Sequence, residues 1–156
     1  MVFVASTLLA SCAPAERSWL SDNGEIAILK VVAPAPVNVG APSDATMAVY
    51  ATIVNRAAFA DTLVTVESPV ARVAGLHSTM DHGGAKMMMP AASIPVPAGA
   101  VERLAPGGTH VMLEQLTRLA APGDSVAVTL VFKRAGRVQL QATVVAYDQL
   151  ERALRP

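Results

Sequence analysis

The chain has 156 residues, of which 53% are hydrophobic but only 4% aromatic, and its 12 Lys and Arg balance its 12 Asp and Glu. A net charge of zero without a basic stripe argues against nucleic-acid binding and against electrostatic attachment to a membrane surface. The length fits one domain with a core of its own, and no apolar run approaches the roughly 18 residues needed to span a bilayer.

The first twelve residues have the pattern of an export signal. A short apolar stretch from Met1 to Ala10 leads into Leu9-Ala10-Ser11-Cys12, which resembles the bacterial lipobox, where small residues precede a cysteine that becomes lipidated. Apolar segments of this kind are targeting signals and not part of the fold. We therefore expect a lipid anchor at Cys12 and a location in the periplasm, at the outer membrane if the cell is Gram-negative. No Lys or Arg precedes the apolar stretch, and the alternative is an incidental cysteine.

The sequence predicts one β-domain over residues 24–146, between an export signal and polar tether over residues 1–23 and a short tail over residues 147–156. Runs of β-formers separated by Gly and Pro predict strands. In chain order these are Ile26–Val32, Met47–Val54, Asp61–Val66, Val70–His77, Lys86–Met89, Val101–Leu104, Thr109–Leu113, Val126–Phe132 and Val138–Val145. A short helix is expected over Ala146–Leu154. Many short strands with Gly/Pro turns are typical of a sandwich or barrel, so the fold class is all-β.

Histidine and methionine are unevenly distributed in this domain. The chain has three His and seven Met, and four of the Met fall between residues 80 and 89. Met112 follows His110 by two positions, so in a strand their side chains share one face, about 6.5–7 Å apart along the chain. Thioether sulfur is soft and favours Cu(I), whereas zinc sites rely on Cys, His and carboxylates. The one cysteine lies in the leader, so the domain offers no thiolate for a blue-copper centre.

The spacing of four residues resembles the signature of a known family. His77, ten residues, Met88, twenty-one residues, His110, one residue and Met112 reproduce the His-x10-Met-x21-His-x-Met pattern of the periplasmic copper chaperones called PCuAC. The likeness extends from about residue 47 to residue 145. It implies a cupredoxin-like Greek-key β-barrel or sandwich with a single domain, and a Cu(I) site whose ligands are these four residues.

The same resemblance implies a function. PCuAC chaperones are implicated in supplying Cu(I) to the dinuclear copper centre of cytochrome c oxidase. The expected protein is therefore an extracytoplasmic metallochaperone and not an enzyme, with an oxidase subunit or another copper chaperone as its acceptor. Two alternatives stay open: a copper-scavenging or resistance lipoprotein, and a structural β-sandwich whose His and Met set is accidental. Some family members carry a His- and Met-rich tail, whereas residues 149–156 contain neither.

Several other residues near the signature are weaker candidates. Met87 and Met89 alternate with Met88, so they are expected to face the opposite side of their strand. Met47 is expected to pack in the core, as most Met in β-proteins do. Four residues stay open as auxiliary contacts to copper: Met80, His82, Met87 and Met89. The sequence predicts that Met80 and His82 lie in a loop.

Overall fold

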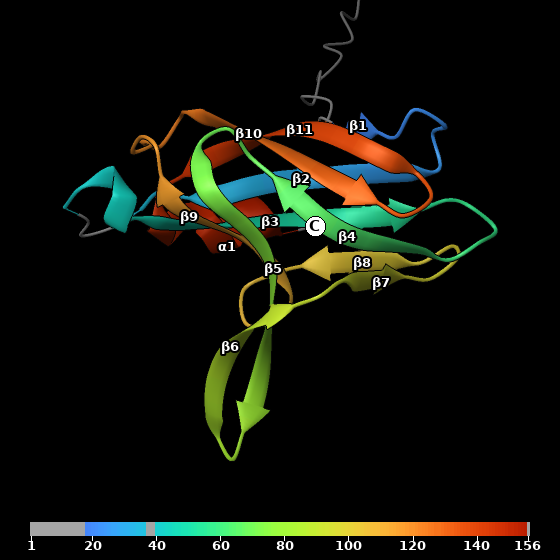
Figure 1. The fold of residues 1–156 in the computed structure, drawn as a ribbon, viewed down its shortest axis with the longest axis horizontal. Helices are drawn as coiled ribbons and strands as arrows, with labels where there is room; N and C mark the ends of the chain where they lie inside the picture. The colour runs from blue at the N-terminus through green and yellow to red at the C-terminus, as the bar shows by residue number, and fades with distance from the viewer. Residues whose placement is uncertain (1–17, 37–39, 156) are drawn as a thin grey trace, which may run out of the picture.

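The computed structural model of the chain describes residues 18–36 and 40–155 (Figure 1). In this part of the chain eleven strands join into one sheet, which confirms the all-β prediction. The strands are β1 (Ser18–Leu20), β2 (Ile26–Pro34), β3 (Thr46–Asn55), β4 (Asp61–Glu67), β5 (Ala71–His82), β6 (Ala85–Ala91), β7 (Ile94–Val96), β8 (Val101–Leu104), β9 (His110–Leu116), β10 (Ser125–Phe132) and β11 (Gly136–Val145). The helical elements are η1 (Pro42–Asp44), η2 (Tyr147–Gln149) and α1 (Leu150–Leu154). No helix among the described residues is both long and apolar enough to cross a bilayer.

Burial alternates residue by residue along the last two long strands. Along β10 and β11 every second residue is buried, and the residues between them are partly or fully exposed. Side chains on a strand point alternately to its two faces, so this pattern buries one face and leaves the other solvated. The two strands form an antiparallel hairpin that supplies about a third of the core cluster.

The sheet is rolled around one hydrophobic core. Its strand order is β6-β5-β9-β3-β2-β11-β10-β4-β7, with β1 added to β2 and β8 added to β3. The first half of β3 pairs with β9 and its second half with β8, so the sheet divides within this strand. Buried residues from β4, β5, β9 and β10 nevertheless belong to a single cluster. Strands on the two sides of this division therefore face each other across the core.

A bulge in β2 creates a second, smaller apolar cluster on the outside of the sheet. Lys30 has a positive φ of 52°, and the register between β2 and β3 shifts between Leu29 and Val32. Val32 then packs with Tyr50 and with Leu150 of α1. The C-terminal helix thus covers the outer surface of β2 and β3 next to β9.

The first strand lies inside the segment that the sequence predicts to be a tether. β1 pairs antiparallel with residues 27–29 of β2, and Trp19 packs against the core. Three residues with two adjacent apolar side chains, Trp19 and Leu20, are too few to show a strand periodicity, so the sequence does not predict β1. Cys12 and the predicted export signal lie outside the described residues.

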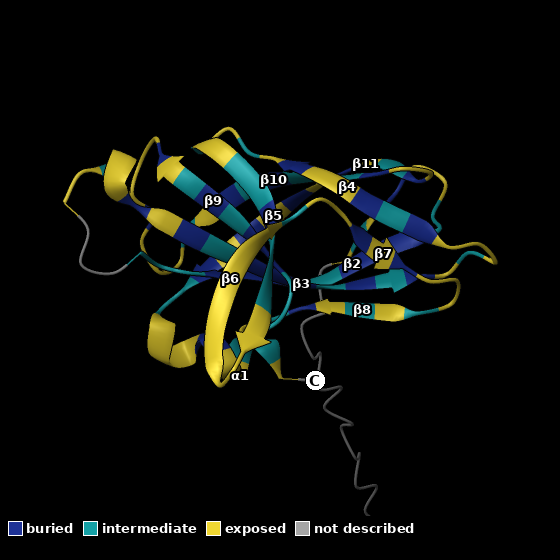
Figure 2. Cartoon of the chain, turned by 60° about the horizontal axis from the view of Figure 1, so that its bottom comes forward, coloured by how far each residue is buried: buried dark blue, intermediate teal, exposed yellow. Residues whose placement is uncertain are grey.

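The β5–β6 hairpin projects from the body of the molecule (Figures 1 and 2). The sequence predicts that β5 ends at His77, but the strand continues to His82, so Met80 and His82 lie in a strand and not in a loop. The reason is a tight two-residue turn: Gly83 and Gly84 have φ of 64° and 90°, as the hairpin turns that match strand twist require. The exposed colouring of Figure 2 runs along nearly all of β6.

Candidate metal centre

The centre of the site is a cross-strand pair of histidines. β5 and β9 are antiparallel, and their register places His77 directly opposite His110. The two imidazole centroids are 5.9 Å apart, with their planes at 62°. In β9 the buried Val111 and Leu113 belong to the core, so His110 and Met112 share the outer face. Three of the four predicted ligands therefore lie together on one face of the sheet.

Gly75 leaves space between His77 and Met112. It is the cross-strand partner of Met112, and a Cβ built on it would stand 3.7 Å from Nε2 of His77. The His77 imidazole therefore lies over the glycine, on the side of Met112. A branched side chain at this position would occupy the volume between the two donors.

His110 is held rigidly by its surroundings. It is 3% exposed, and its Nδ1 lies 3.1 Å from the carbonyl oxygen of Gly108. Because a carbonyl only accepts, this contact requires the proton on Nδ1 and leaves the lone pair of Nε2 for a metal ion. Metal-binding histidines commonly have their second nitrogen fixed in this way. The Pro-Gly-Gly turn before β9 therefore orients the ring as well as reversing the chain.

Tyr50 forms the inner wall of the site. Its ring centroid is 6.2 Å from that of His110. Burial, and to a smaller degree the nearby Tyr147, raises the pKa of the Tyr50 phenol above its usual value. The phenol therefore stays neutral and contributes packing beside His110 without charge.

Glu114 also lies at the site, although the sequence pattern predicts no role for it. Its Oε1 lies 3.8 Å from Nε2 of His77. A carboxylate beside neutral imidazole and thioether donors favours a bound cation by Coulombic attraction. The signal was present: Glu114 follows His110 and Met112 at the same two-residue spacing, so it shares their face.

Met88 lies on the same face but further out, on the projecting hairpin. The register pairs His77 with Pro90 and Thr79 with Met88, so Met88 is a diagonal neighbour of His77, at about 7–8 Å between backbones. Its side chain is 61% exposed. The structure thus brings His77, His110 and Met112 together and places Met88 at the open edge of the set.

The remaining candidates separate by face and by burial. Met47 is 2% exposed and belongs to the core, as predicted. The hairpin register pairs Met80 with Met87, on the face opposite Met88. Met89, two residues from Met87, shares that opposite face, as expected from alternation. These methionines are therefore not part of the cluster around His77 and His110.

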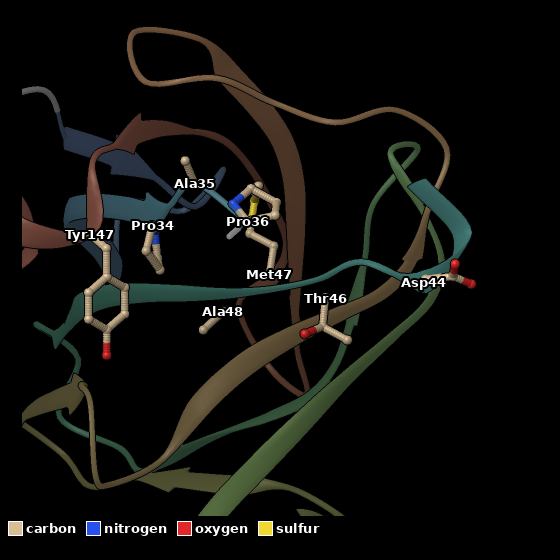
Figure 3. A pocket seen from close by; sticks show the side chains of 8 residues that line it. All are labelled: Pro34, Ala35, Pro36, Asp44, Thr46, Met47, Ala48 and Tyr147. Atoms are coloured by element: carbon tan, nitrogen blue, oxygen red, sulfur yellow. The ribbon is translucent and has the colours of Figure 1, made fainter. Parts of the chain in front are cut away.

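The surface at the start of β3 is hollowed. An open pocket of about 190 Å³ lies between the start of β3 and the C-terminal segment (Figure 3). Its lining includes Ala48 and Thr46, which are the cross-strand partners of Met112 and Glu114. Tyr147 forms part of its wall. Met112 itself is not among the residues that line this pocket, so the pocket lies next to the candidate centre and not within it.

Comparison with protein families identifies the chain. The family model described as LpqE-like, a lipoprotein family, matches residues 26–144. The chain belongs to the LpqE-like family. This family falls within the PCuAC clan, so the resemblance drawn from the His and Met signature is confirmed.

The LpqE-like chain shares its fold with solved PCuAC domains. The copper-bound PCuAC domain from PmoF2 is 27% identical, with a TM-score of 0.68 over 83% of this chain and 98% of that one. The apo PCuAC domain from PmoF1 is 25% identical, with a TM-score of 0.69 over 83% and 99%. The Cu(I) form of DR1885 from Deinococcus radiodurans is 27% identical, with a TM-score of 0.58 over 75% and 77%. These likenesses confirm the cupredoxin-like fold.

A curated relative is also a lipoprotein by name. The lipoprotein Lxx21020 of Leifsonia xyli subsp. xyli (strain CTCB07) is 43% identical over 58 residues. That match covers 36% of this chain and 35% of the relative, so the chain spans about a third of that protein's length.

Proposed function

We propose that this LpqE-like chain holds Cu(I) with His77, Met88, His110 and Met112. The observation that carries the proposal is the register of β5 and β9, which sets His77 against His110 with Met112 on the same face. Two imidazoles and two thioethers form a neutral, soft donor set that suits Cu(I). The Cu(I) form of DR1885 and the copper-bound PmoF2 domain support the same metal.

The proposed role is that of a metallochaperone and not of an enzyme. His110 is 3% exposed and Met88 is 61% exposed, so one ligand is fixed in the sheet and another is open to an approaching protein. A metal-binding side chain of the acceptor protein can replace the exposed Met88 thioether first. The ion then moves to the acceptor protein by stepwise ligand exchange. The proposed acceptor is the copper centre of a cytochrome c oxidase subunit, or another copper chaperone that serves it.

The proposed location is the periplasm, with a lipid anchor at Cys12 and attachment to the outer membrane if the cell is Gram-negative. Support comes from the lipobox-like segment in the sequence and from the LpqE-like lipoprotein family. Mass spectrometry of the protein purified from membranes tests this part, since a Cys12→Ser variant should lack the lipid and appear in the soluble fraction.

A Cu(I) competition titration against a chromophoric chelator tests the ligand set. Met112→Leu should weaken binding by about tenfold or more, because even indirect partners of metal ligands cost that much. The fold should persist, since volume-conserving swaps usually cost under about 1.5 kcal/mol. Met47→Leu, which changes a core methionine, is the matched control and should bind as the wild type does. Wild-type affinity in Met112→Leu would contradict the site.

A transfer assay tests the chaperone role separately. The Cu(I)-loaded protein is mixed with an apo oxidase copper domain, and the two are separated and analysed for metal. Copper should move to the oxidase domain. If the chain keeps its copper against an excess of the apo domain, delivery to the oxidase is refuted while copper binding stands.

A further inference from the structure

The two faces of the β5–β6 hairpin differ in chemistry. The face that carries Met88 also pairs Asp81 with Lys86. Over the same stretch of the hairpin, the reverse face carries no carboxylate or ammonium group. Its side chains are mainly thioethers, with one imidazole. We call this reverse face the thioether face, and its donors are Met80, His82, Met87 and Met89.

Burial does not explain these methionines. Met80 and Met87 are each 52% exposed and Met89 is 44% exposed. Methionine in a β-protein ordinarily fills gaps in a core, and scattered exposed apolar side chains need no explanation. Here three adjacent thioethers gather on one side of a two-stranded ribbon that is exposed on its other side as well. Packing therefore gives no reason for the cluster.

The backbone places these donors within reach of one ion. Met80 and Met87 are directly opposite each other, a relation that puts Cβ atoms about 4.5–5.5 Å apart. Met89 lies diagonally from Met80, and His82 follows Met80 by two residues on the same strand, about 6.5–7 Å away. Three rotatable bonds let each thioether turn toward a common point.

The hairpin turn keeps this register fixed. Gly83 and Gly84 both have positive φ, and the N–H of Gly84 donates to Oδ1 of Asp81 at 2.8 Å. A turn of this kind fixes which residues face each other across the two strands. The Met80–Met87 pair is therefore set before any ion arrives.

We propose that the thioether face is a second Cu(I) site, formed by Met80 and Met87 with Met89 or His82 as a third donor. Neutral, soft donors select Cu(I) and its analogue Ag(I) over harder ions. The site shares its metal with the proposed function but none of its ligands, so the two stand or fall separately. Met87 and Met89 flank Met88 in β6, which puts the second site directly behind the exposed ligand of the first. Ions collected on the thioether face thus arrive beside the strand that feeds the His77–His110 centre.

Methyl NMR of the whole chain with ¹³C-labelled methionine methyl groups tests the proposal, with Ag(I) as a redox-stable probe. Single Met→Leu variants assign the signals. In a His110→Ala/Met112→Leu variant, Ag(I) should still shift the Met80 and Met87 signals, while the Met47 signal stays in place. Stationary Met80 and Met87 signals in excess Ag(I), in a wild-type chain whose Met112 signal does move, would overturn the second site and leave the proposed function intact. The converse pattern would refute the proposed function alone.

Stoichiometry provides an independent readout. Met80→Leu/Met87→Leu keeps the apolar area and removes both sulfurs, so the chain should lose one bound Cu(I) while the His77–His110 centre keeps its affinity. Met47→Leu is again the matched control. An unchanged Cu(I) stoichiometry in the double variant would overturn the second site. Of His82→Asn and Met89→Leu, the substitution that weakens Ag(I) binding at this face by about tenfold or more identifies the third donor. Unchanged Ag(I) binding in the combined His82→Asn/Met89→Leu variant would exclude a third donor.

Discussion

The two ends of the candidate metal centre lie in very different surroundings. His110 belongs to β9, within the rolled sheet, with a hydrogen bond to Gly108 and the Tyr50 ring beside it. Met88 belongs to a ribbon that solvent reaches from both sides. In the proposed centre, the sheet fixes the position of His110 before any ion binds, while the ribbon leaves Met88 free to exchange. Substitutions at the two ends should therefore separate stability from copper retention.

The largest effect is expected at the buried end. His110→Ala removes a proposed ligand, a hydrogen bond to the Gly108 carbonyl and the packing beside Tyr50. Truncating a side chain that is 3% exposed leaves a cavity in the packing, so both the free energy of unfolding and the Cu(I) affinity should fall. Denaturant unfolding of the apo protein and Cu(I) competition measure the two. If the apo variant is as stable as the apo wild type, the packing and hydrogen bond of the His110 side chain do not stabilise the fold.

A smaller effect, confined to copper, is expected at Gly75. Val suits a strand, but its methyl groups would enter the space between His77 and Met112. Gly75→Val should therefore weaken Cu(I) binding with little change in unfolding. Gly75→Ala is the control, because a Cβ there makes only an ordinary contact at 3.7 Å from Nε2 of His77. Equal affinities for the two variants would contradict the role given to this space.

At the exposed end, Met88→Leu should weaken Cu(I) binding and leave the fold untouched. Surface substitutions usually change the free energy of unfolding by less than about 0.5 kcal/mol. Thermal unfolding of the apo protein and Cu(I) competition, run side by side with His110→Ala, give the contrast directly. A stability loss as large as that of His110→Ala would remove the distinction between the two ends.

The smallest effect is expected on the far surface of the body. The Arg137 guanidinium donates to the Glu67 carboxylate, with Nη1 2.9 Å from Oε1, and this hydrogen bonding lowers the pKa of Glu67. A lowered carboxyl pKa contributes stability above the unfolded-state pKa, and this is lost as the pH falls through the folded value. In Glu67→Gln, the melting temperature should therefore fall slightly less steeply as the pH is lowered than it does in the wild type. The Cu(I) affinity should be unchanged. Both groups are exposed, so the pair is weak. A changed copper affinity would show that the body surface and the site are coupled.

The sequence predicts the parts of this molecule that follow local periodicity. Runs of β-forming residues between Gly and Pro turns predict β10 and β11, and the two-residue spacing of His110 and Met112 predicts that both lie on one face. The predicted end of β5 at His77 is wrong. The outer half of this strand belongs to a ribbon that is exposed on both sides, so Met80 and His82 show no apolar alternation. Residues that meet across strands were harder still. Gly75 and Tyr50 join the site through long-range register, which no local pattern encodes.

The two ends of the sheet order are β6 and β7, and each pairs with one strand only among the described residues. Each contains a proline, Pro90 and Pro95, and β6 also carries Lys86. Proline gives no N–H to a neighbouring ladder, and edge lysines oppose strand addition. A chain that displays several methionines on one such edge would otherwise invite copies of itself to extend the sheet. We therefore expect encounters at the hairpin to be made by side chains alone and to end once the ion has moved.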